Sequence, residues 1–331
     1  MALNGTTPDL QRTILEYTFR GILCLETLFI LAGNAMTFVA IKRVKKLREI
    51  PTNIFVLSLA ASDGMVGIIT PIFIALKILK IDTEEDGMIC LLQGSHVSMF
   101  LISLVTLLAV AVDRYLAVVH PLTYRQRMTI KRARIVTVLI WLLSFGLITS
   151  LSCYYGTTVL NSNTVRSLFP KAISLVLLQV MILGPVLGNI AIYVLIYVKL
   201  KTKRRVGSEM TRSNFGGRDS GTSRATKAYV NMMALVLGYL IFASMPNYLL
   251  LATLRQMPDP KPKWFVLAYD ISVILFYSNS FMNPVIYSWK NRNFRAAYKH
   301  IMRCNRSSDV SVDESMTEGS RIENRSATIT S

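Results

Sequence analysis

The sequence predicts an all-α membrane protein, a seven-transmembrane helix bundle, and three observations carry this prediction. The 331 residues are 52% hydrophobic and only 17% charged, which is too apolar for a typical soluble protein. Apolar runs long enough to cross a hydrocarbon core of about 30 Å recur along the chain. Basic residues gather in the short segments between these runs, which despite the net charge of +18 is typical of membrane proteins and not of nucleic-acid binding.

Seven apolar runs are long enough to span, with approximate limits 17–42, 52–79, 88–119, 132–152, 168–199, 228–254 and 264–288. Each is predicted to be a helix, because a segment inside lipid must satisfy its backbone hydrogen bonds internally. The predicted organisation is an extracellular N-terminus over 1–16, the bundle over 17–288, an amphipathic membrane-surface helix over 289–302 and a disordered cytoplasmic tail over 303–331. No basic segment followed by an apolar core precedes the first run, so no cleaved signal peptide is expected.

The charges between the runs predict the orientation of the chain. The segments after the first, third and fifth runs are rich in lysine and arginine, whereas the segment after the second run is acidic over 82–86. Basic segments stay on the cytoplasmic side of a membrane. We therefore expect a multi-pass protein of the plasma membrane, with its N-terminus outside and its C-terminus in the cytoplasm.

The third run ends in a charged triplet. It carries no charge from Cys90 until Asp113-Arg114-Tyr115. At 1.5 Å per residue, a helix from Cys90 to Arg114 is roughly 36 Å long, which slightly exceeds a bilayer core. The cysteine and the triplet are therefore predicted to lie at opposite faces of the membrane.

Polar residues inside the predicted spans are functional candidates. An ionisable residue in the bilayer costs at least about 2.5 kcal/mol, and Asp63 is the clearest case. Asn34, Ser103, Asn279 and Asn283 also lie within spans. They form either one shared cluster with Asp63 or separate interhelical hydrogen bonds worth about 1 kcal/mol each. The residues alone leave both interpretations open.

Prolines interrupt several of the predicted helices. Pro284, within Asn283-Pro284-Val285-Ile286-Tyr287, removes a backbone hydrogen bond near the end of the seventh run. Pro185 and Pro246 do the same in the fifth and sixth runs. These are places where a helix can bend.

Together these motifs resemble those of the rhodopsin-like (class A) G-protein-coupled receptors. One falls in each run, in the family's order, over about residues 17–300: Gly33-Asn34, Leu59-Ala60-Ala61-Ser62-Asp63, Asp113-Arg114-Tyr115, Trp141, Pro185 with Tyr193, Pro246 and Asn283-Pro284-Val285-Ile286-Tyr287. Residues 53–61 and 113–121 look closest to adenosine-type and other small-ligand receptors. The resemblance implies a receptor that transmits the binding of an extracellular small molecule or peptide to a heterotrimeric G protein.

The resemblance also implies roles for particular residues. G-protein coupling and activation would involve Asp113, Arg114, Tyr115, Tyr193, Asn283, Pro284 and Tyr287. A pocket for an allosteric sodium ion would be formed by Asp63, Ser103, Asn279 and Asn283, with Asn34 beside it. No other cofactor or metal is expected. Cys90 and Cys153 would form a disulfide at the outer side.

A ligand pocket is placed by position only, at Gln93, His96, Phe100, Tyr248, Tyr269 and Tyr277. His96 stands where the family has the aspartate that binds biogenic amines, and Leu251 where adenosine-type receptors have the asparagine that holds adenine. Tyr277 replaces the lysine that binds retinal in opsins, so light sensing through a Schiff base is not expected. The ligand is left unassigned. A histidine at this depth fits a hydrogen bond to a neighbouring carbonyl as well as it fits a ligand contact.

The sixth run departs twice from the family pattern. Ser244 stands where a tryptophan is usual, and Thr226 where many members have an acid that pairs with the arginine of the triplet. Arg224 and Lys227 flank Thr226 and repel Arg114. We therefore expect raised ligand-free signalling, because the ion pair that would hold the inner face shut is missing.

The two ends of the chain predict modification and partner sites. Asn4 begins an N-glycosylation triplet. Residues 290–301 are too charged to span, and their apolar residues recur at helical spacing, so this helix should lie on the lipid of the inner leaflet. Cys304, just beyond it, is a candidate palmitoylation site. The tail that follows is rich in Ser and Thr, as expected of a site for receptor kinases and arrestin.

The main alternative is a membrane transporter. A transporter is expected to show an internal repeat with paired broken helices, and the sequence has no such self-similarity. An enzyme is not predicted, because three histidines and four scattered cysteines form no metal or nucleophile constellation.

Overall fold

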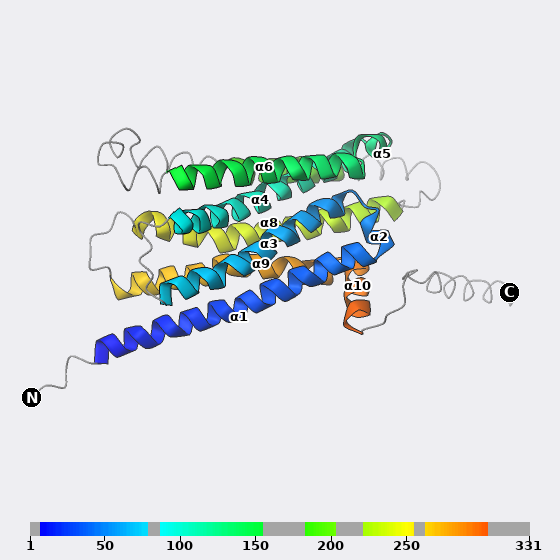
Figure 1. Cartoon of the computed structure of the whole chain (residues 1–331). Coiled ribbons are helices and arrows are strands. Elements are labelled where there is room, and N and C mark those ends of the chain that lie inside the picture. The colour runs from blue at the N-terminus through cyan, green and yellow to red at the C-terminus, as the bar shows by residue number, and fades with distance from the viewer. Residues whose placement is uncertain (1–6, 79–86, 155–182, 203–220, 255–261, 304–331) are drawn as a thin grey trace, which may run out of the picture.

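The protein forms a bundle of long helices that run side by side (Figure 1). The computed structural model describes residues 7–78, 87–154, 183–202, 221–254 and 262–303. The long helices are α1 (Thr7–Arg43), α3 (Thr52–Ile78), α4 (Gly87–Val119), α6 (Ile130–Tyr154), the helix Leu183–Thr202, α8 (Gly221–Leu254) and α9 (Lys263–Lys290). No strand occurs among these residues, and the predicted all-α bundle is confirmed.

Six of the seven long helices are long and apolar enough to cross a membrane when the described residues alone are searched. The seventh, α6, is 25 residues long and lies along the outside of the bundle against α4 (Figure 1). α1 and α8 begin well before their apolar runs predict, at Thr7 and Gly221. The start of the fifth predicted run, residues 168–182, lies outside the described residues.

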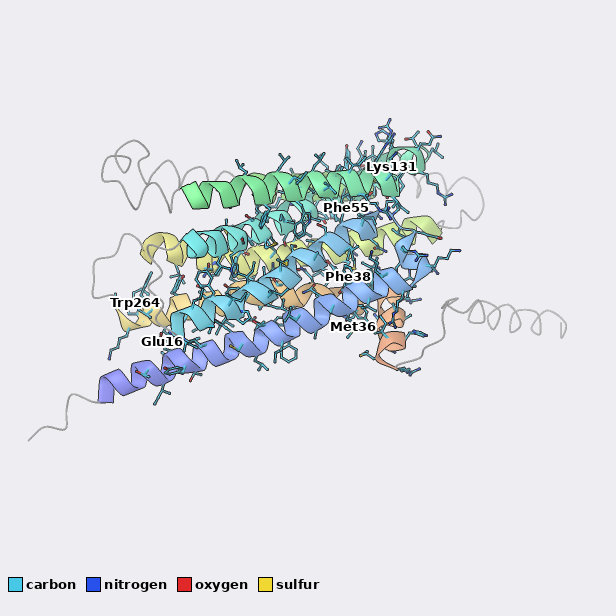
Figure 2. The ribbon with its side chains drawn as sticks, viewed as in Figure 1. Glu16, Met36, Phe38, Phe55, Lys131 and Trp264 are labelled. Carbon is cyan, nitrogen blue, oxygen red and sulfur yellow. The ribbon has the colours of Figure 1, made fainter. Side chains whose placement is uncertain are left out.

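The outer surface of the bundle is apolar, as lipid contact requires. Large hydrophobic side chains are exposed on several long helices: Leu28, Phe29, Leu142, Leu143, Leu187 and Phe242. The interior instead holds polar side chains such as Asn34, Asp63, Asn189 and Asn283, all at most 5% exposed. Figure 2 shows Glu16 and Trp264 near one end of the bundle and Lys131 near the other.

Two glycines allow close helix packing around α1. A Cβ atom on Gly33 would lie 3.1 Å from Cγ of Pro284, so α1 approaches α9 where the proline interrupts that helix. A Cβ on Gly67 would lie 3.0 Å from side-chain atoms of Ile30 and Leu31, so α3 approaches α1 equally closely. Small residues at helix interfaces let backbones approach in membrane proteins.

Three short helices lie at one end of the bundle: α2 (Lys45–Arg48), α5 (Tyr124–Arg127) and α10 (Arg292–Met302) (Figure 1). α10 turns across the ends of α1 and α9. The side chain of Asn291 caps it, because Oδ1 accepts a hydrogen bond from the backbone N–H of Asn293 at 3.0 Å. The amphipathic helix expected here is therefore present as a separate element.

The apolar face of α10 packs on the bundle. Phe294, Ala297 and Tyr298 are buried, and the ring of Phe294 lies 5.6 Å from that of Tyr287. The Tyr298 hydroxyl forms a 2.7 Å hydrogen bond with Thr37 Oγ1 of α1. Burial raises the pKa of Tyr298 to about 12, so this phenol stays protonated at physiological pH.

Candidate functional site

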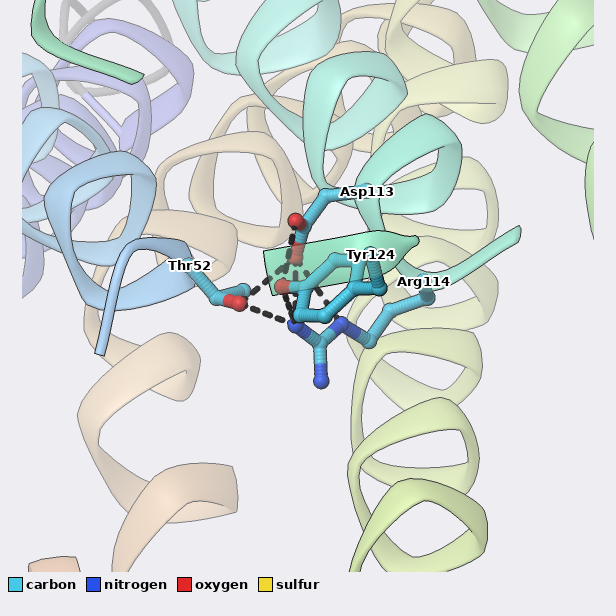
Figure 3. A network of polar contacts seen from close by, with 4 residues as sticks. All are labelled: Thr52, Asp113, Arg114 and Tyr124. Atoms are coloured by element: carbon cyan, nitrogen blue, oxygen red, sulfur yellow. Dashed lines mark hydrogen bonds and ion pairs between the residues drawn. The ribbon is translucent and has the colours of Figure 1, made fainter. Parts of the chain in front are cut away.

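The charged triplet at the end of α4 forms a hydrogen-bonded network with two neighbouring elements. We call Thr52, Asp113, Arg114 and Tyr124 the inner network (Figure 3). Arg114 Nε donates to Asp113 Oδ2 at 3.0 Å, and Thr52 Oγ1 donates to the same oxygen at 2.6 Å. Tyr124 Oη donates to Asp113 Oδ1 at 2.8 Å and accepts from Arg114 Nη2 at 2.9 Å. Arg114 also donates to Thr52 Oγ1.

The charged pair of the inner network is closed to solvent, and Tyr124 is half-buried beside it. Asp113 is fully buried, and Arg114 is 8% exposed. A buried ion pair is tolerated when further hydrogen bonds satisfy its remaining polar atoms, and Thr52 and Tyr124 supply them here. Burial raises the pKa of Tyr124 to about 12, so its hydroxyl remains a donor to Asp113. The arginine is therefore held at the C-terminal end of α4 and is not available to a partner in this conformation.

Two members of the inner network were not among the residues singled out from the sequence. Thr52 is the first residue of α3, and Tyr124 begins α5, the short helix after the triplet. Thr52 begins the second predicted span, and Tyr124 lies in the basic segment after the third; the charge pattern puts both at the same face as Arg114, and this shared face was the available signal. Tyr115 is not in the network: it packs against the apolar cluster of Val118, Ile196 and Val230.

Tyr193 and Tyr287 lie on either side of this region. Tyr193, on the helix Leu183–Thr202, is within electrostatic reach of Arg114, and its buried hydroxyl has no hydrogen-bond partner among the described residues. Tyr287, on α9, is 1% exposed and packs on Phe294 of α10. The structure thus places the two tyrosines on two different helices, Leu183–Thr202 and α9.

Deeper in the bundle, polar side chains from three helices gather around Asp63, and we call Asp63, Ser103, Asn279, Ser280 and Asn283 the central cluster. Asn283 Nδ2 donates to Asp63 Oδ2 at 2.7 Å. Ser103 and Ser280 also hydrogen-bond the Asp63 carboxylate. The side chains of Asp63, Ser103, Asn279 and Ser280 help to line a cavity of about 10 Å³, which is about the space of one water-sized particle. The geometry is that of one shared cluster and not of separate helix-to-helix bonds.

Asn34 lies beside the central cluster and joins α1 to α9. Its Nδ2 donates to the backbone oxygens of Ser280 and Ile30, each at 2.9 Å. Ser280 was not singled out from the sequence, because one serine in an apolar helix gives little signal. The side-chain oxygens Oδ1 of Asn279 and Asn283 have no hydrogen-bond partner among the described residues.

Three residues of the predicted ligand pocket meet just beyond the central cluster. His96, Phe100 and Tyr277 line the same cavity as Asp63. The His96 and Tyr277 rings are 5.2 Å apart and meet edge to face, and Phe100 lies 5.1 Å from Phe276. Tyr269 is half-buried two helical turns before Tyr277 on α9.

The other predicted sites fall partly or wholly outside the described residues. Gln93 and Cys90 lie in α4, Tyr248 in α8 and Cys153 in α6, but the positions of their side chains are not described. Asn4 and Cys304 lie outside the described ranges. The pocket contacts of Gln93 and Tyr248, the disulfide, the glycan and the palmitoyl group therefore stay predictions.

Comparisons with known proteins bear on the family of the chain. A family model described as "7 transmembrane receptor (rhodopsin family)" matches residues 33–287. The Histamine H2 receptor of Cavia porcellus is 30% identical, covering 98% of this chain and 91% of that receptor. The Adenosine receptor A2b of Homo sapiens is 28% identical, covering 82% of this chain and 85% of that receptor.

The matched region contains the inner network, the central cluster and the helices that position both. It runs from Gly33, which packs on Pro284, to Tyr287 at the end of the last spanning helix. The match favours a receptor over the transporter that the sequence left as the alternative. The chain belongs to the rhodopsin family of seven-transmembrane receptors, and it is a G-protein-coupled receptor of the membrane.

Proposed function

We propose that this receptor lies in the plasma membrane with its N-terminus outside the cell and transmits an extracellular ligand signal to a heterotrimeric G protein at the end that carries α2, α5 and α10. The observation that carries the proposal is the buried Asp113–Arg114 pair at that end. The same end is basic, with arginine or lysine exposed on all three short helices. Basic segments between spans mark the cytoplasmic side, which supports this orientation.

Activation in this proposal is the release of Arg114 from the inner network. While Arg114 bonds Asp113, Thr52 and Tyr124, its guanidinium is unavailable to a partner. A ligand shifts the population toward the released state only as far as it binds that state more tightly. Asp63 and Asn283 join α3 to α9 between the ligand side and the inner side, so a movement of either helix is transmitted to Tyr287, one turn further in.

A sodium ion in the central cluster is a further part of the proposal. Hard cations prefer oxygen ligands, and this cluster offers the Asp63 carboxylate, the Ser103 hydroxyl and the Asn279 amide oxygen at the cavity, with the Asn283 amide oxygen beside them. Neither amide oxygen has a hydrogen-bond partner among the described residues. The cavity of about 10 Å³ admits one small particle. The residues therefore fit a monovalent cation that stabilises the closed arrangement, and no other cofactor is proposed.

The chemical identity of the ligand is a separate question. The relatives are named for histamine and adenosine. His96 occupies the place of the amine-binding aspartate, and Leu251 that of the adenine-binding asparagine. The proposed ligand is an extracellular small molecule or peptide. We do not propose that His96 binds an amine as that aspartate does, or that Leu251 binds adenine as that asparagine does.

The remaining partners follow from the position of each segment. Receptor kinases and arrestin are proposed to act on the Ser/Thr-rich tail, and Cys304 to carry a palmitoyl group that holds α10 on the inner leaflet. Asn4 is proposed to carry a glycan, and Cys90 and Cys153 to form the outer disulfide. No catalytic reaction and no nucleic-acid partner are proposed.

Nucleotide exchange on purified G proteins tests the function. The full chain is reconstituted in proteoliposomes and mixed in turn with heterotrimers of the Gs, Gi and Gq classes, with empty liposomes as the control. We expect faster exchange than the control for at least one class, and an N-terminal epitope accessible to antibody on intact cells. Control-level exchange with every class, or an epitope accessible only after permeabilisation, would contradict the proposal.

A further inference from the structure

One charged residue lies within the membrane-spanning part of α1 between Arg20 and Lys42, and it is Glu26. Its depth below Arg20 is about 9 Å, at 1.5 Å per residue. The side chain is 7% exposed, so the carboxylate faces the bundle and not the lipid. It lies on the buried stripe of α1, whose members recur every three or four residues: Glu26, Ile30, Asn34, Thr37 and Ile41.

The packing of α1 fixes what Glu26 faces. Gly67 of α3 packs against Ile30, so Thr70, one turn further along α3, lies near the level of Glu26. Tyr277 of α9 hydrogen-bonds Thr70 and is within electrostatic reach of the Glu26 carboxylate. Three helices therefore bring polar side chains to one level of the bundle.

His96 of α4 completes this level, and we call Glu26, Thr70, His96 and Tyr277 the Glu26 layer. The His96 ring lies 5.2 Å from that of Tyr277 and 6.4 Å from that of Phe73. Glu26 Oε2 and His96 Nε2 are both buried, and neither has a hydrogen-bond partner among the described residues. His96 and Tyr277 also line the cavity that leads to Asp63, so the layer adjoins an internal space.

A buried carboxylate oxygen without a partner in a membrane span is costly unless a cation pairs with it. The surroundings select the kind of cation. Imidazole and phenol rings with one carboxylate suit an organic ammonium, which hydrogen-bonds the carboxylate and lies against aromatic rings. An alkali ion instead favours a site made mainly of oxygen ligands, as in the central cluster, whereas the Glu26 layer sets an imidazole and aromatic rings beside its oxygens.

We propose that Glu26 binds the ammonium group of a small organic amine, with His96 and Tyr277 enclosing it, and that this layer is the cation subsite of the ligand pocket. The proposal rests on the proposed receptor function, because it assigns a ligand class to the receptor. It differs from that function in being testable by binding alone, without a G protein.

Thermal unfolding of the purified full chain in lipid nanodiscs tests the subsite. The probes are three amine and alcohol pairs of matched shape: propylamine with 1-propanol, benzylamine with benzyl alcohol, and phenethylamine with 2-phenylethanol. The sodium chloride concentration is constant, so occupancy of the central cluster does not change. We expect at least one amine to stabilise the parent at a concentration at least about tenfold below its alcohol, because only the amine forms a charge-assisted bond.

Three variants localise the effect. Glu26→Gln keeps the shape of the side chain and should remove the preference for amines. Glu16→Gln is the matched control on the same helix, where the exposed carboxylate pairs with Arg20, and it should keep the preference. His96→Asp in the Glu26→Gln background places a carboxylate on the other side of Tyr277 and should restore it.

Each possible result either supports or overturns the proposal. Equal stabilisation by amines and alcohols throughout the panel in the parent overturns the proposal, as does an amine preference that persists in Glu26→Gln. If Glu26→Gln does not fold, Glu26→Asp replaces it: a shorter carboxylate should keep the preference with weaker affinity, and unchanged affinity overturns the proposal. Nucleotide exchange without amine is measured in parallel, so failure of G-protein coupling is distinguished from failure of the subsite.

Discussion

The inner network and the Glu26 layer each bury a carboxylate beside a nitrogen-bearing side chain and a tyrosine, but they differ in how far their hydrogen bonds are satisfied. In the inner network, both carboxylate oxygens of Asp113 accept hydrogen bonds from side chains of the same chain. In the Glu26 layer, Glu26 Oε2 and His96 Nε2 have none among the described residues. A satisfied buried network fixes one conformation, whereas unsatisfied buried groups indicate a place that another molecule completes.

The central cluster lies between the inner network and the Glu26 layer, and it contains both satisfied and unsatisfied polar groups. Asp63 is bonded to Asn283, whereas Asn279 and Asn283 each keep an amide oxygen without a partner among the described side chains. Through His96 and Tyr277 it shares a cavity with the Glu26 layer, and through α9 it is connected to Tyr287 beside α10. Changes at the three levels should therefore have effects of different kinds and sizes.

The largest effect is expected from Arg114→Ala. The change removes the cation that the G protein would meet at the inner face and leaves the Asp113 carboxylate bonded to Thr52 and Tyr124. Nucleotide exchange should fall to the level of empty liposomes, while surface expression is largely retained. Arg125→Ala, which alters an exposed arginine of α5, is the matched control and should leave most exchange intact. Undiminished exchange in Arg114→Ala would show that the arginine is not needed for coupling.

Next in size is the response of Asp63→Asn to sodium. Basal exchange by the parent should be lower in sodium chloride than in an equal concentration of N-methylglucamine chloride, because the ion stabilises the closed state. The variant should lose this difference entirely, because the one carboxylate of the central cluster is gone. Ser62→Ala is a useful control: its hydroxyl bonds Ser103 at 2.9 Å but is not one of the groups around the cavity. If the basal exchange rate of the parent is the same in both salts, the central cluster has a purely structural role.

Much of this architecture was predictable from the sequence, because a membrane span needs a long apolar run whatever its neighbours are. The start of α1 at Thr7 was not predictable from the sequence, because the helix extends into polar residues where hydropathy carries no signal. Asp63, Asn283 and Arg114 were identified because an ionisable or amide group within a span, or a charged triplet at its end, is unusual in itself.

The partners of these residues were harder to predict. Thr52 is 61 residues from Asp113, and Tyr124 is 11 residues from it, so their contacts depend on how α3 and α5 pack on α4. Glu26 was also missed, although a carboxylate within the first apolar run was visible in the sequence. Its significance depends on the register of α1 against α3 and α9, which places it opposite Tyr277 and not against lipid.

A smaller effect is expected from Tyr124→Phe. The variant keeps the ring beside the Arg114 guanidinium but loses the hydroxyl that donates to Asp113 and accepts from Arg114. A hydrogen bond of this kind contributes about 1 kcal/mol, so a minor active population of about 1% should rise roughly fivefold. Ligand-free exchange at matched receptor density measures this. An unchanged basal rate would mean that the hydroxyl does not help to hold Arg114.

The smallest effect is expected from Thr226→Glu. Thr226 lies in the first turns of α8, at the place where many family members have an acid that pairs with the arginine of the triplet. The sequence alone predicts raised basal activity from the missing acid. The inner network reduces the expected size of that effect, because Asp113, Thr52 and Tyr124 already hold Arg114.

A new glutamate at position 226 should therefore lower ligand-free exchange only about twofold in the parent, since an exposed or half-exposed ion pair contributes at most about 1 kcal/mol. In the Tyr124→Phe background the same glutamate should have the larger effect, because the arginine is less firmly held there. Thr226→Gln is the control, with the same shape and no charge. If the glutamate lowers the basal rate equally in both backgrounds, the contact of Arg114 with Tyr124 and its contact with the new glutamate act independently. Arg114 would then not exchange between the two.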